Sequence, residues 1–403
     1  MAIIARASAV VTVTKGAVNA VADWVGDAAE GAWAKGEAEA QGEHGYRSLA
    51  VAEEGKLLGL IALQDPPRPD SRALIERLHG LGIKVKMLTG DALPVAKSIA
   101  TQIGLGTVVR ASDKELVPVL ECADGIAEVY PETKYRVIEA LQSAGHIVGM
   151  TGDGVNDAPS LKKAEVGIAV STATDAAKSA ASVVLTTGGL GGIVDLVENG
   201  RAVYQRILTW MINKLSRTVL KAGFVLGAYF LTGKFVISAI GMLLVVLMTD
   251  FAKIALATDR VRISPRPDTW NVGRLALLGG FLGLVMLAES IFLLKLGMHK
   301  FCLAAGGRSL HTFSFLLLLY LALFSILSIR ERRFFWASMP STWLLFALGA
   351  DFLIGLFVGA YGAFELPPLA WATIGFVIGG SAVFALVLND LIKVAWIKVS
   401  LSP

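Results

Sequence analysis

The sequence predicts two folds in one chain: an α/β domain built on a doubly wound parallel sheet, followed by an all-α bundle of six transmembrane helices. Up to about residue 200, short apolar runs alternate with amphipathic segments of helical period, whereas most later residues lie in long apolar blocks. The 403 residues are 54% hydrophobic, and their mean hydropathy is +0.62. Such a composition is too apolar for an ordinary soluble enzyme and indicates a membrane protein.

Charge and cysteine content narrow the possible partners. A net charge of +4 gives no electrostatic support for binding nucleic acid, so we expect no nucleic-acid partner. Cys122 and Cys302 lie far apart in the sequence, which argues against a disulfide framework and suits a cytosolic soluble part. Residues 1–16 lack a long apolar core and have a strand-like pattern, so we expect no signal peptide.

Within the soluble part, short apolar runs and amphipathic helices alternate from residue 56, which predicts parallel strands joined by helices. Strands are expected at 57–63, 83–91 and 146–154, and helices at 71–82, 94–104 and 132–145. Ligands of such sheets bind beyond the carboxyl ends of the strands. Two Thr-Gly-Asp sequences lie at these ends, at 89–91 and 151–153.

The second of these sequences belongs to the string TGDGVNDAP at 151–159. Asp153 and Asp157 lie four residues apart around a turn that contains glycine, and Asn156 and Asp157 open the next helix, where such caps are favoured. Two converging carboxylates suit Mg²⁺, which binds few protein carboxylates together with phosphate. The alternative is that both acids only cap a turn. The complete string, with a strand before it and a helix after it, favours the metal site.

Lys134 opens the helix expected at 132–145. A lysine beside carboxylates and a phosphate would neutralise the charge that develops in phosphoryl transfer. Taken alone, a lysine at such a position is most often a solvated surface residue.

Six apolar blocks predict the membrane helices, because crossing a bilayer takes about 20 mostly apolar residues. The blocks lie at 209–231, 235–257, 274–296, 311–329, 342–363 and 369–392. A short turn at 232–234 makes the first two a helical hairpin. The alternative, that a few blocks are buried helices of a soluble protein, is weakened by their occurring in succession.

Loop charge predicts the orientation of these helices. The segments 258–274 and 330–333 are rich in arginine, whereas 361–368 carries only Glu365. We therefore expect the arginine-rich loops, residues 1–200 and both termini on the cytoplasmic side of a multi-pass protein of the cell membrane.

Four strings then carry a family resemblance: DPPRPDSR (65–72), KMLTGD (86–91), PETK (131–134) and TGDGVNDAP (151–159). In their order and rough spacing they resemble the phosphorylation domain of P-type cation-transporting ATPases, a domain of the haloacid-dehalogenase superfamily. Six helices after this domain are also the plan of the family, so the chain resembles the C-terminal half of such a pump. The resemblance implies a phosphorylation domain at 56–200, a transmembrane domain at 201–403, and Mg²⁺ and ATP as cofactors.

The resemblance also implies roles for particular residues. Thr89, Gly90 and Asp91 would hold the phosphoryl group and later the hydrolytic water, and Lys134 would contact the phosphate. Asp153 would be a principal Mg²⁺ ligand, with Asn156 and Asp157 beside it.

Residues 1–55 resemble the end of the family's nucleotide-binding domain. VTVTKGAV (11–18) and GYRSLAVA (45–52) are similar to two of its strands. Lys15 would then lie by the adenine of ATP, and Arg47 would reach the ATP phosphates.

No Asp-Lys-Thr sequence occurs in the 403 residues, although in this family that aspartate accepts the phosphoryl group from a strand at the centre of the sheet. Asp65 is a poor substitute, because two prolines follow it where a phosphate-binding loop needs backbone N–H groups. We therefore expect one half of a split pump, joined by a complementary N-terminal chain, or a truncated product. Truncation is favoured, since a sheet without its central strand exposes unpaired edges.

Asp250 predicts a transport site within the second span, because a carboxylate in a membrane helix is costly and therefore a functional candidate. Lys253 lies on the same helix face and could pair with it. A purely structural ion pair is the alternative, and for Glu289 and Asp351, in other spans, we expect packing or interhelical hydrogen bonds. The strings 65–70, 86–91 and 259–270 look more like proton pumps than calcium or sodium–potassium pumps.

The sequence thus predicts a component or truncated form of an ATP-driven cation pump, with H⁺ as the expected ion, because one carboxylate beside a lysine is a poor cage for Ca²⁺. A pump for another cation, such as Ca²⁺ or Mg²⁺, is one alternative. A membrane-anchored remnant or regulatory chain without catalysis is another. A phosphatase on a membrane anchor is disfavoured by the missing nucleophile.

Overall fold

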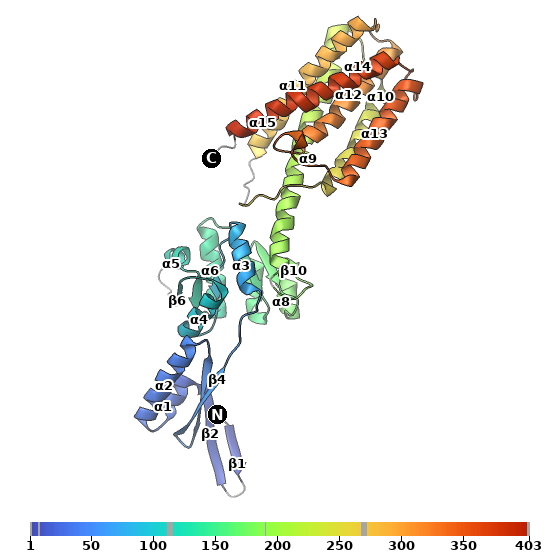
Figure 1. Cartoon of the computed structure of the whole chain (residues 1–403). Helices are drawn as coiled ribbons and strands as arrows, with labels where there is room; N and C mark the ends of the chain where they lie inside the picture. The colour runs from blue at the N-terminus through green and yellow to red at the C-terminus, as the bar shows by residue number, and fades with distance from the viewer. Residues whose placement is uncertain (1, 7–8, 111–115, 190, 267–271, 401–403) are drawn as a thin grey trace. The chain divides into compact units, whose positions relative to one another are not determined.

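The computed structural model describes residues 2–6, 9–110, 116–189, 191–266 and 272–400. The chain divides into two compact units, one of residues 1–197 with 265–267 and one of residues 198–264 with 268–403. Each unit is described by itself below (Figure 1).

The first unit begins with an antiparallel sheet in the order β1-β2-β3-β4, on which two helices pack. Its elements are β1 (Ala2–Arg6), β2 (Ala9–Ala17), α1 (Val18–Trp24), α2 (Ala28–Glu43), β3 (Arg47–Glu53) and β4 (Lys56–Leu63). Asp27 caps α2, since its carboxylate accepts the Ala29 N–H at 2.7 Å. Val21, Ala34 and Ala50 form the centre of this small core.

The strand predicted at 57–63 exists as β4, but it does not begin the parallel sheet. It pairs antiparallel with β3, Arg47 opposite Leu63 and Glu53 opposite Lys56. A tight turn at Glu54 and Gly55, both with positive φ, folds β4 straight back onto β3. The parallel α/β part therefore starts only after this strand, later than the alternation of apolar runs predicted.

The rest of this unit holds parallel strands with helices between them, as predicted, but in two three-stranded sheets instead of one. Their orders are β5-β7-β6 and β10-β9-β8. The strands are β5 (Met87–Leu88), β6 (Val108–Arg110), β7 (Gly125–Ala127), β8 (Gly149–Gly152), β9 (Val166–Ala169) and β10 (Val183–Val184). The helices are α3 (Ser71–Gly80), α4 (Leu93–Ile103), α5 (Leu116–Cys122), α6 (Pro131–Ser143), α7 (Ala158–Lys163) and α8 (Asp175–Ala180).

The division falls between β5 and β8, the two strands that end in Thr-Gly-Asp sequences. β5 pairs only with β7, and β8 pairs only with β9, among the strands of the described residues. Each therefore has one edge without a partner strand, and each is shorter than predicted.

The second unit is a bundle of long helices that run alongside one another (Figure 1). They are α9 (Gly191–Thr232), α10 (Ala239–Ala255), α11 (Val272–Lys300), α12 (Arg308–Ile329), α13 (Thr342–Tyr361), α14 (Trp371–Val383) and α15 (Asn389–Ser400). A π-helical turn, η4 (Phe384–Leu388), joins the last two. Ser238 and Ser341 cap α10 and α13 by accepting the N–H of Gly241 and Leu344.

Five of these helices are long and apolar enough to cross a membrane: Ala239–Thr258, Val272–Lys300, Arg308–Ile329, Thr342–Tyr361 and Trp371–Val399. The first of the six predicted spans, 209–231, is helical but is not among the five. It is the second half of α9, and Lys214, Arg217 and Lys221 lower its hydropathy. Leu220 and Phe224 of this stretch are nevertheless fully buried in the core of the bundle.

α12 occupies the centre of the bundle. Its residues 315–322 are all fully buried, and neighbours on α10, α13 and α14 cover it. A helix that is apolar all round needs protein or lipid on every side. Tyr320, the largest of its fully buried residues, satisfies its hydroxyl by donating to the Phe352 carbonyl at 3.1 Å.

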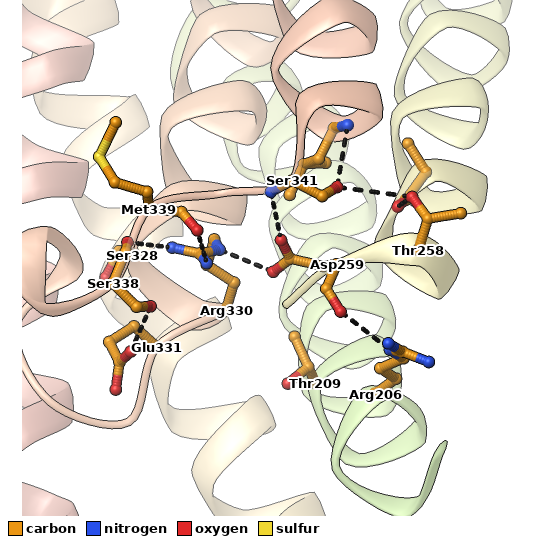
Figure 2. A network of polar contacts seen from close by, with 12 residues as sticks. Arg206, Thr209, Thr258, Asp259, Ser328, Arg330, Glu331, Ser338, Met339 and Ser341 are labelled. Atoms are coloured by element: carbon orange, nitrogen blue, oxygen red, sulfur yellow. Dashed lines mark hydrogen bonds and ion pairs between the residues drawn. The ribbon is translucent and has the colours of Figure 1, made fainter. Parts of the chain in front are cut away.

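A polar network fastens one end of this bundle (Figure 2). Arg330 Nε donates to Asp259 Oδ2 at 2.7 Å, and the Ser341 N–H donates to Asp259 Oδ1 at 2.8 Å. Arg206 Nε on α9 donates to the Asp259 carbonyl at 2.9 Å. Because Asp259 and Arg330 are both buried, this ion pair is shielded from water, which strengthens it and makes it costly to break.

Candidate functional site

The residues after β5 form a compact polar turn. Thr89 Oγ1 donates to Asp91 Oδ2 at 2.7 Å and accepts the Asp91 N–H at 3.2 Å. The turn is held from the other side by the segment after β7: the Val129 N–H donates to the Thr89 carbonyl at 3.0 Å, and the Glu128 N–H donates to the Asp91 carbonyl at 3.0 Å. Both side chains of the predicted pair are thus fixed at the carboxyl end of β5.

The same segment leads directly to the second strand end. α6 begins at Pro131, which suits the first turn of a helix, and this turn carries Lys134. Lys134 Nζ lies 2.8 Å from Asp157 Oδ1, with side chains only 21% and 8% exposed. The short stretch 128–134 therefore ties the turn after β5 to the turn after β8.

Asp157 uses both of its carboxylate oxygens within the protein. Oδ1 accepts from Lys134, and Oδ2 accepts the N–H groups of Asp153 and Gly154, each at 3.3 Å. These contacts fold the residues after β8 into the turn η1 (Val155–Asp157). The structure therefore gives Asp157 the partners of a residue that positions Lys134 and this turn, and its role as a metal ligand stays a prediction.

Asp153 has the opposite character. Its side chain is exposed at the carboxyl end of β8, and its carboxylate makes no hydrogen bond or ion pair with any described residue. Asn156, exposed on the same turn, is likewise open to solvent. One free carboxylate with Lys134 nearby fits Mg²⁺ held chiefly by phosphate oxygens and water. Across the described part of the chain no group of three or more His, Cys, Asp or Glu residues could hold a metal by itself.

Hydrogen bonds to Glu165 also hold together the N-terminal ends of β8 and β9. Glu165, just before β9, accepts the Val148 N–H at 2.8 Å and the Gln142 side-chain amide at 2.9 Å. These donors, the Val148 N–H first, hold the pKa of Glu165 below its usual range. This carboxylate therefore stabilises the pairing of β8 with β9 in its ionised form.

The two residues expected to bind nucleotide lie on the antiparallel sheet. Lys15 is exposed on β2 opposite Val51 of β3, and Arg47 is exposed at the start of β3. They lie four β3 positions apart rather than side by side. Arg47 Nη1 comes within 3.9 Å of Asp91 Oδ1, which places a second cation beside the turn after β5. Gly90, in that turn, is exposed.

In the helical unit, Asp250 and Lys253 form the expected ion pair on α10. Their exposure differs from the prediction, because the side chain of Asp250 is 50% exposed and that of Lys253 only 11%. Asp250 is therefore not a carboxylate buried in the bundle of described residues.

The pair borders a cavity of about 570 Å³ between α9 and α10 that is unusually rich in cations. Besides Lys253, three cations of α9 line it: Lys214, Arg217 and Lys221. Lys221 Nζ donates to Thr249 Oγ1 at 3.2 Å, and the buried Arg217 donates to the Thr249 carbonyl at 3.4 Å. These three residues were missed from the sequence, although their spacing by three and four positions in an apolar block puts them on one helix face.

Two further carboxylates that the sequence placed within spans are buried. Glu289 on α11 and Asp351 on α13 are 5% and 6% exposed. Glu289 accepts a hydrogen bond from Asn389 at 2.9 Å, as expected for an interhelical contact. Asp351 Oδ2 has no hydrogen-bond partner among the described residues.

Comparison with known proteins shows which domain type contains these strand-end residues. Residues 6–165 match the family model described as haloacid dehalogenase-like hydrolase, a region that contains both Thr-Gly-Asp turns and Lys134. The chain thus combines a domain of this hydrolase type with a bundle of helices long enough to span a membrane.

Relatives extend the match into the bundle. A protein of Methanocaldococcus jannaschii that is named, by prediction, a cation-transporting ATPase is 34% identical over 374 residues, which are 88% of this chain and 46% of the relative. Plasma membrane ATPase 1 of Saccharomyces cerevisiae is 36% identical over 338 residues, 79% of this chain and 36% of the relative. The plasma membrane ATPase of Kluyveromyces lactis is 36% identical over 315 residues, which are 74% of this chain and 35% of the relative. The chain is therefore related in sequence to cation-transporting and plasma membrane ATPases, and it spans less than half the length of these relatives.

Proposed function

We propose that this chain supplies the phosphate-binding edge and the ion-conducting helices of an ATP-driven cation pump of the cell membrane, and that the transported ion is H⁺. The observation that carries the proposal is the tie between the two strand ends. The stretch 128–134 hydrogen-bonds the Thr89–Asp91 turn and pairs Lys134 with Asp157. This arrangement brings cationic and polar groups together at the carboxyl ends of β5 and β8, where they could bind a phosphoryl group.

Each residue at this edge has a chemical task in the proposal. Lys134, oriented by Asp157, neutralises charge on the phosphoryl oxygens, and Thr89 with Gly90 and Asp91 positions the group and the water that later attacks it. Asp153, with Asn156 beside it, is the carboxylate free to hold Mg²⁺, which when bound would offset phosphate charge. Arg47 and Lys15 are proposed to hold the phosphates and the adenine of ATP.

Among the described residues, β5 and β8 each have one edge without a partner strand, and in the proposal one more strand lies between these edges. We propose that a complementary segment provides this strand and the aspartate that takes the phosphoryl group. A strand inserted there would pair on both sides and would end beside Lys134 and Asp153.

The charge of the cavity between α9 and α10 supports a proton. Four cations and one carboxylate line it, and such an excess of positive charge repels a metal cation in a medium of low dielectric constant. A proton needs only one group that can bind and release it. Asp250, paired with Lys253, is that group in the proposal, and α9 is proposed as a sixth span beside it.

The test places the chain and a complementary segment bearing the phosphorylated aspartate in lipid vesicles with a pH-sensitive dye inside. We expect ATP with Mg²⁺ to drive proton movement, and Asp250→Asn to lower its rate by about 100-fold or more, as loss of a proton-transfer group does. Binding of a fluorescent ATP analogue should be unchanged in this variant.

Asp175→Asn serves as the matched control, because Asp175 is an exposed acid on α8 outside both sites. It should leave proton movement at the wild-type rate. Normal pumping by Asp250→Asn would remove Asp250 from the pathway. Transport that follows added Ca²⁺, Mg²⁺ or Na⁺ instead of pH would refute the proton assignment.

A further inference from the structure

A second acidic site lies in the helical unit, away from the cavity that Asp250 borders. Glu289 on α11 and Asn389, the first residue of α15, are 5% and 4% exposed and meet in the interior of the bundle. Asn389 Nδ2 donates to Glu289 Oε2 at 2.9 Å. Both helices belong to candidate membrane spans, so water is not at hand to solvate either group.

The remaining oxygen atoms of the pair carry the argument. Glu289 Oε1 and Asn389 Oδ1 are both buried, and neither has a hydrogen-bond partner among the described residues. Both atoms are acceptors when the acid is ionised, so neither can satisfy the other. An ionised Glu289 would therefore leave a buried charge with one hydrogen bond and a buried amide oxygen with none, each at considerable cost.

The chain turns Asn389 towards α11 by a specific device. The π-helical turn η4, Phe384–Leu388, immediately precedes Asn389. A π-helical turn inserts one residue into a helix and rotates the residues after it, and such turns occur often at functional positions. The next residue, Asp390, binds Ser328 of α12 and the Phe335 N–H instead.

Charged groups near the pair are engaged elsewhere. On α15, Lys393 Nζ lies 2.6 Å from Asp390 Oδ1 and also donates to the carbonyls of Ser328 on α12 and Arg333. On α9, the residues that face α11 at Leu287 and Ile291 are Gly223 and Gly227, which carry no charge. Glu289 forms no ion pair with any described residue, so no cation contact offsets its charge.

The two oxygens are too few to make a metal site. One carboxylate oxygen and one amide oxygen are fewer ligands than the six or more that Ca²⁺ or Mg²⁺ takes. A proton needs only those two atoms.

We infer that Glu289 holds a proton and donates it to Asn389 Oδ1, while Asn389 Nδ2 donates to Glu289 Oε2. Acid and amide then satisfy each other through two parallel hydrogen bonds and clamp α11 to α15. The site binds a proton in the membrane domain independently of Asp250, and it does not depend on the proposed transport function. Release of the proton to solvent would break one bond and leave a charge inside the bundle, so the clamp is held closed by protonation.

The test is infrared spectroscopy on the full 403-residue chain in lipid vesicles. We expect a carboxylic-acid C=O band at neutral pH that is lost in Glu289→Gln and kept in Glu365→Gln, which changes an exposed loop glutamate. Asn389→Leu should keep the band but shift it, because the acid loses its amide partner. A band unaffected by Glu289→Gln would show Glu289 to be ionised and would overturn the inference.

Thermal unfolding of the same samples gives a second readout. Glu289→Gln preserves both hydrogen bonds, since its amide N–H₂ replaces the acid O–H, so its melting temperature should match that of the wild type at neutral pH. At alkaline pH the wild type should unfold at a lower temperature, and Glu289→Gln should not. Stabilisation of the wild type by Na⁺ over choline, lost in Glu289→Gln, would identify a metal cation as the occupant and refute the proton.

Discussion

At the scale of single residues, two aspartates in one nine-residue string have opposite surroundings. Asp157 is 6% exposed and bound through both oxygens, whereas Asp153, four residues earlier, is exposed and bound through none within the described residues. The difference follows from the turn: residues 153 and 154 direct their N–H groups at Asp157, and this leaves the Asp153 side chain outside. Asp157 therefore holds Lys134 and the turn in place, whereas the Asp153 carboxylate is open to solvent; metal binding by either residue stays a prediction.

This contrast predicts different costs of substitution. Asp157→Ala should destabilise the first unit by about 1–3 kcal/mol, because it leaves the half-buried Lys134 and two backbone N–H groups without their acceptor. Asp153→Ala should change stability by less than about 0.5 kcal/mol, as surface substitutions do, and should abolish ATP-driven turnover of the complemented chain. Hydrogen exchange of residues 146–170 measures the first effect.

Asp157→Asn separates shape from charge, since the amide keeps one acceptor for the backbone N–H groups but loses the ion pair. We expect an intermediate cost. Equal costs for Asp153→Ala and Asp157→Ala would contradict the division of roles.

The sequence alone located the site residues of the first unit better than the surroundings of the carboxylates in the second unit. Thr89, Asp91 and Lys134 could be placed at strand ends because Thr-Gly-Asp follows an apolar run and Pro131 opens a helix. The partners of Asp157 and the half exposure of Asp250 could not, because they depend on how turns and neighbouring helices pack. A carboxylate in an apolar block looks the same in sequence whether it faces the core, as Glu289 does, or the bundle surface.

At the scale of elements, the predictions failed where pairing between strands decides the outcome. The run 57–63 reads as a strand in either sheet, and only the turn at Glu54 and Gly55 assigns it to the antiparallel one. The periodicity does not reveal the division between β5 and β8 either, although the missing Asp-Lys-Thr strand had predicted an incomplete sheet with unpaired edges. The five apolar spans were predicted within a few residues, because hydropathy over about 20 residues is a direct physical requirement of the bilayer.

The packing of α9 against α11 depends on small residues. Gly279 and Gly283 of α11 meet the backbone of α9 at Ile212 and Ser216, and the Ser216 hydroxyl donates to the Gly279 carbonyl at 2.9 Å. Close approach of this kind is how helices associate in a bilayer, where burial from water gives no driving force. The contact holds the cationic helix α9 in the bundle.

A single methyl group tests this contact. A Cβ at Gly283 would lie 2.7 Å from the Ser216 carbonyl oxygen, whereas a Cβ at Gly280, on the same helix, meets nothing within 4 Å. Gly283→Ala should therefore cost about 1–3 kcal/mol through overpacking. Gly280→Ala should be neutral or stabilise by up to about 1 kcal/mol, since alanine favours the helix. Unfolding of both variants in the same detergent compares them, and equal stabilities would mean that α9 and α11 adjust freely.

At the scale of the whole molecule, the arginines of segment 330–333, which predicted the membrane orientation, differ in their structural roles. The segment 330–333 was a topological signal in the sequence, yet Arg330 is buried and bound to Asp259 and to the carbonyls of Ser338 and Met339. Its neighbour Arg333 is 59% exposed. Charge counting treats all three arginines alike, whereas the structure leaves Arg332 and Arg333 available to solvent or lipid headgroups and buries Arg330.

The Asp259–Arg330 pair joins segments far apart in the chain (Figure 2). Asp259 follows α10, Arg330 follows α12, and Ser341 precedes α13, while Arg206 brings in α9. Breaking the pair should therefore loosen one end of the bundle as a unit. Arg330→Met should destabilise the helical unit by about 3–5 kcal/mol, because it leaves the Asp259 carboxylate buried with only the Ser341 N–H.

Two further variants isolate the ion pair from simple loss of packing. Arg333→Met, in the same loop, should cost less than about 0.5 kcal/mol, as exposed charges do. Adding Asp259→Asn to Arg330→Met should restore part of the stability, since the neutral amide still accepts the Ser341 N–H without an uncompensated charge. Thermal unfolding of the wild type, Arg330→Met, the single variant Asp259→Asn and the double variant gives the coupling energy as a double-mutant cycle. If the double variant were as unstable as the two single losses added together, the buried pair would contribute no more than its separate contacts, and the end of the bundle would be held by apolar packing instead.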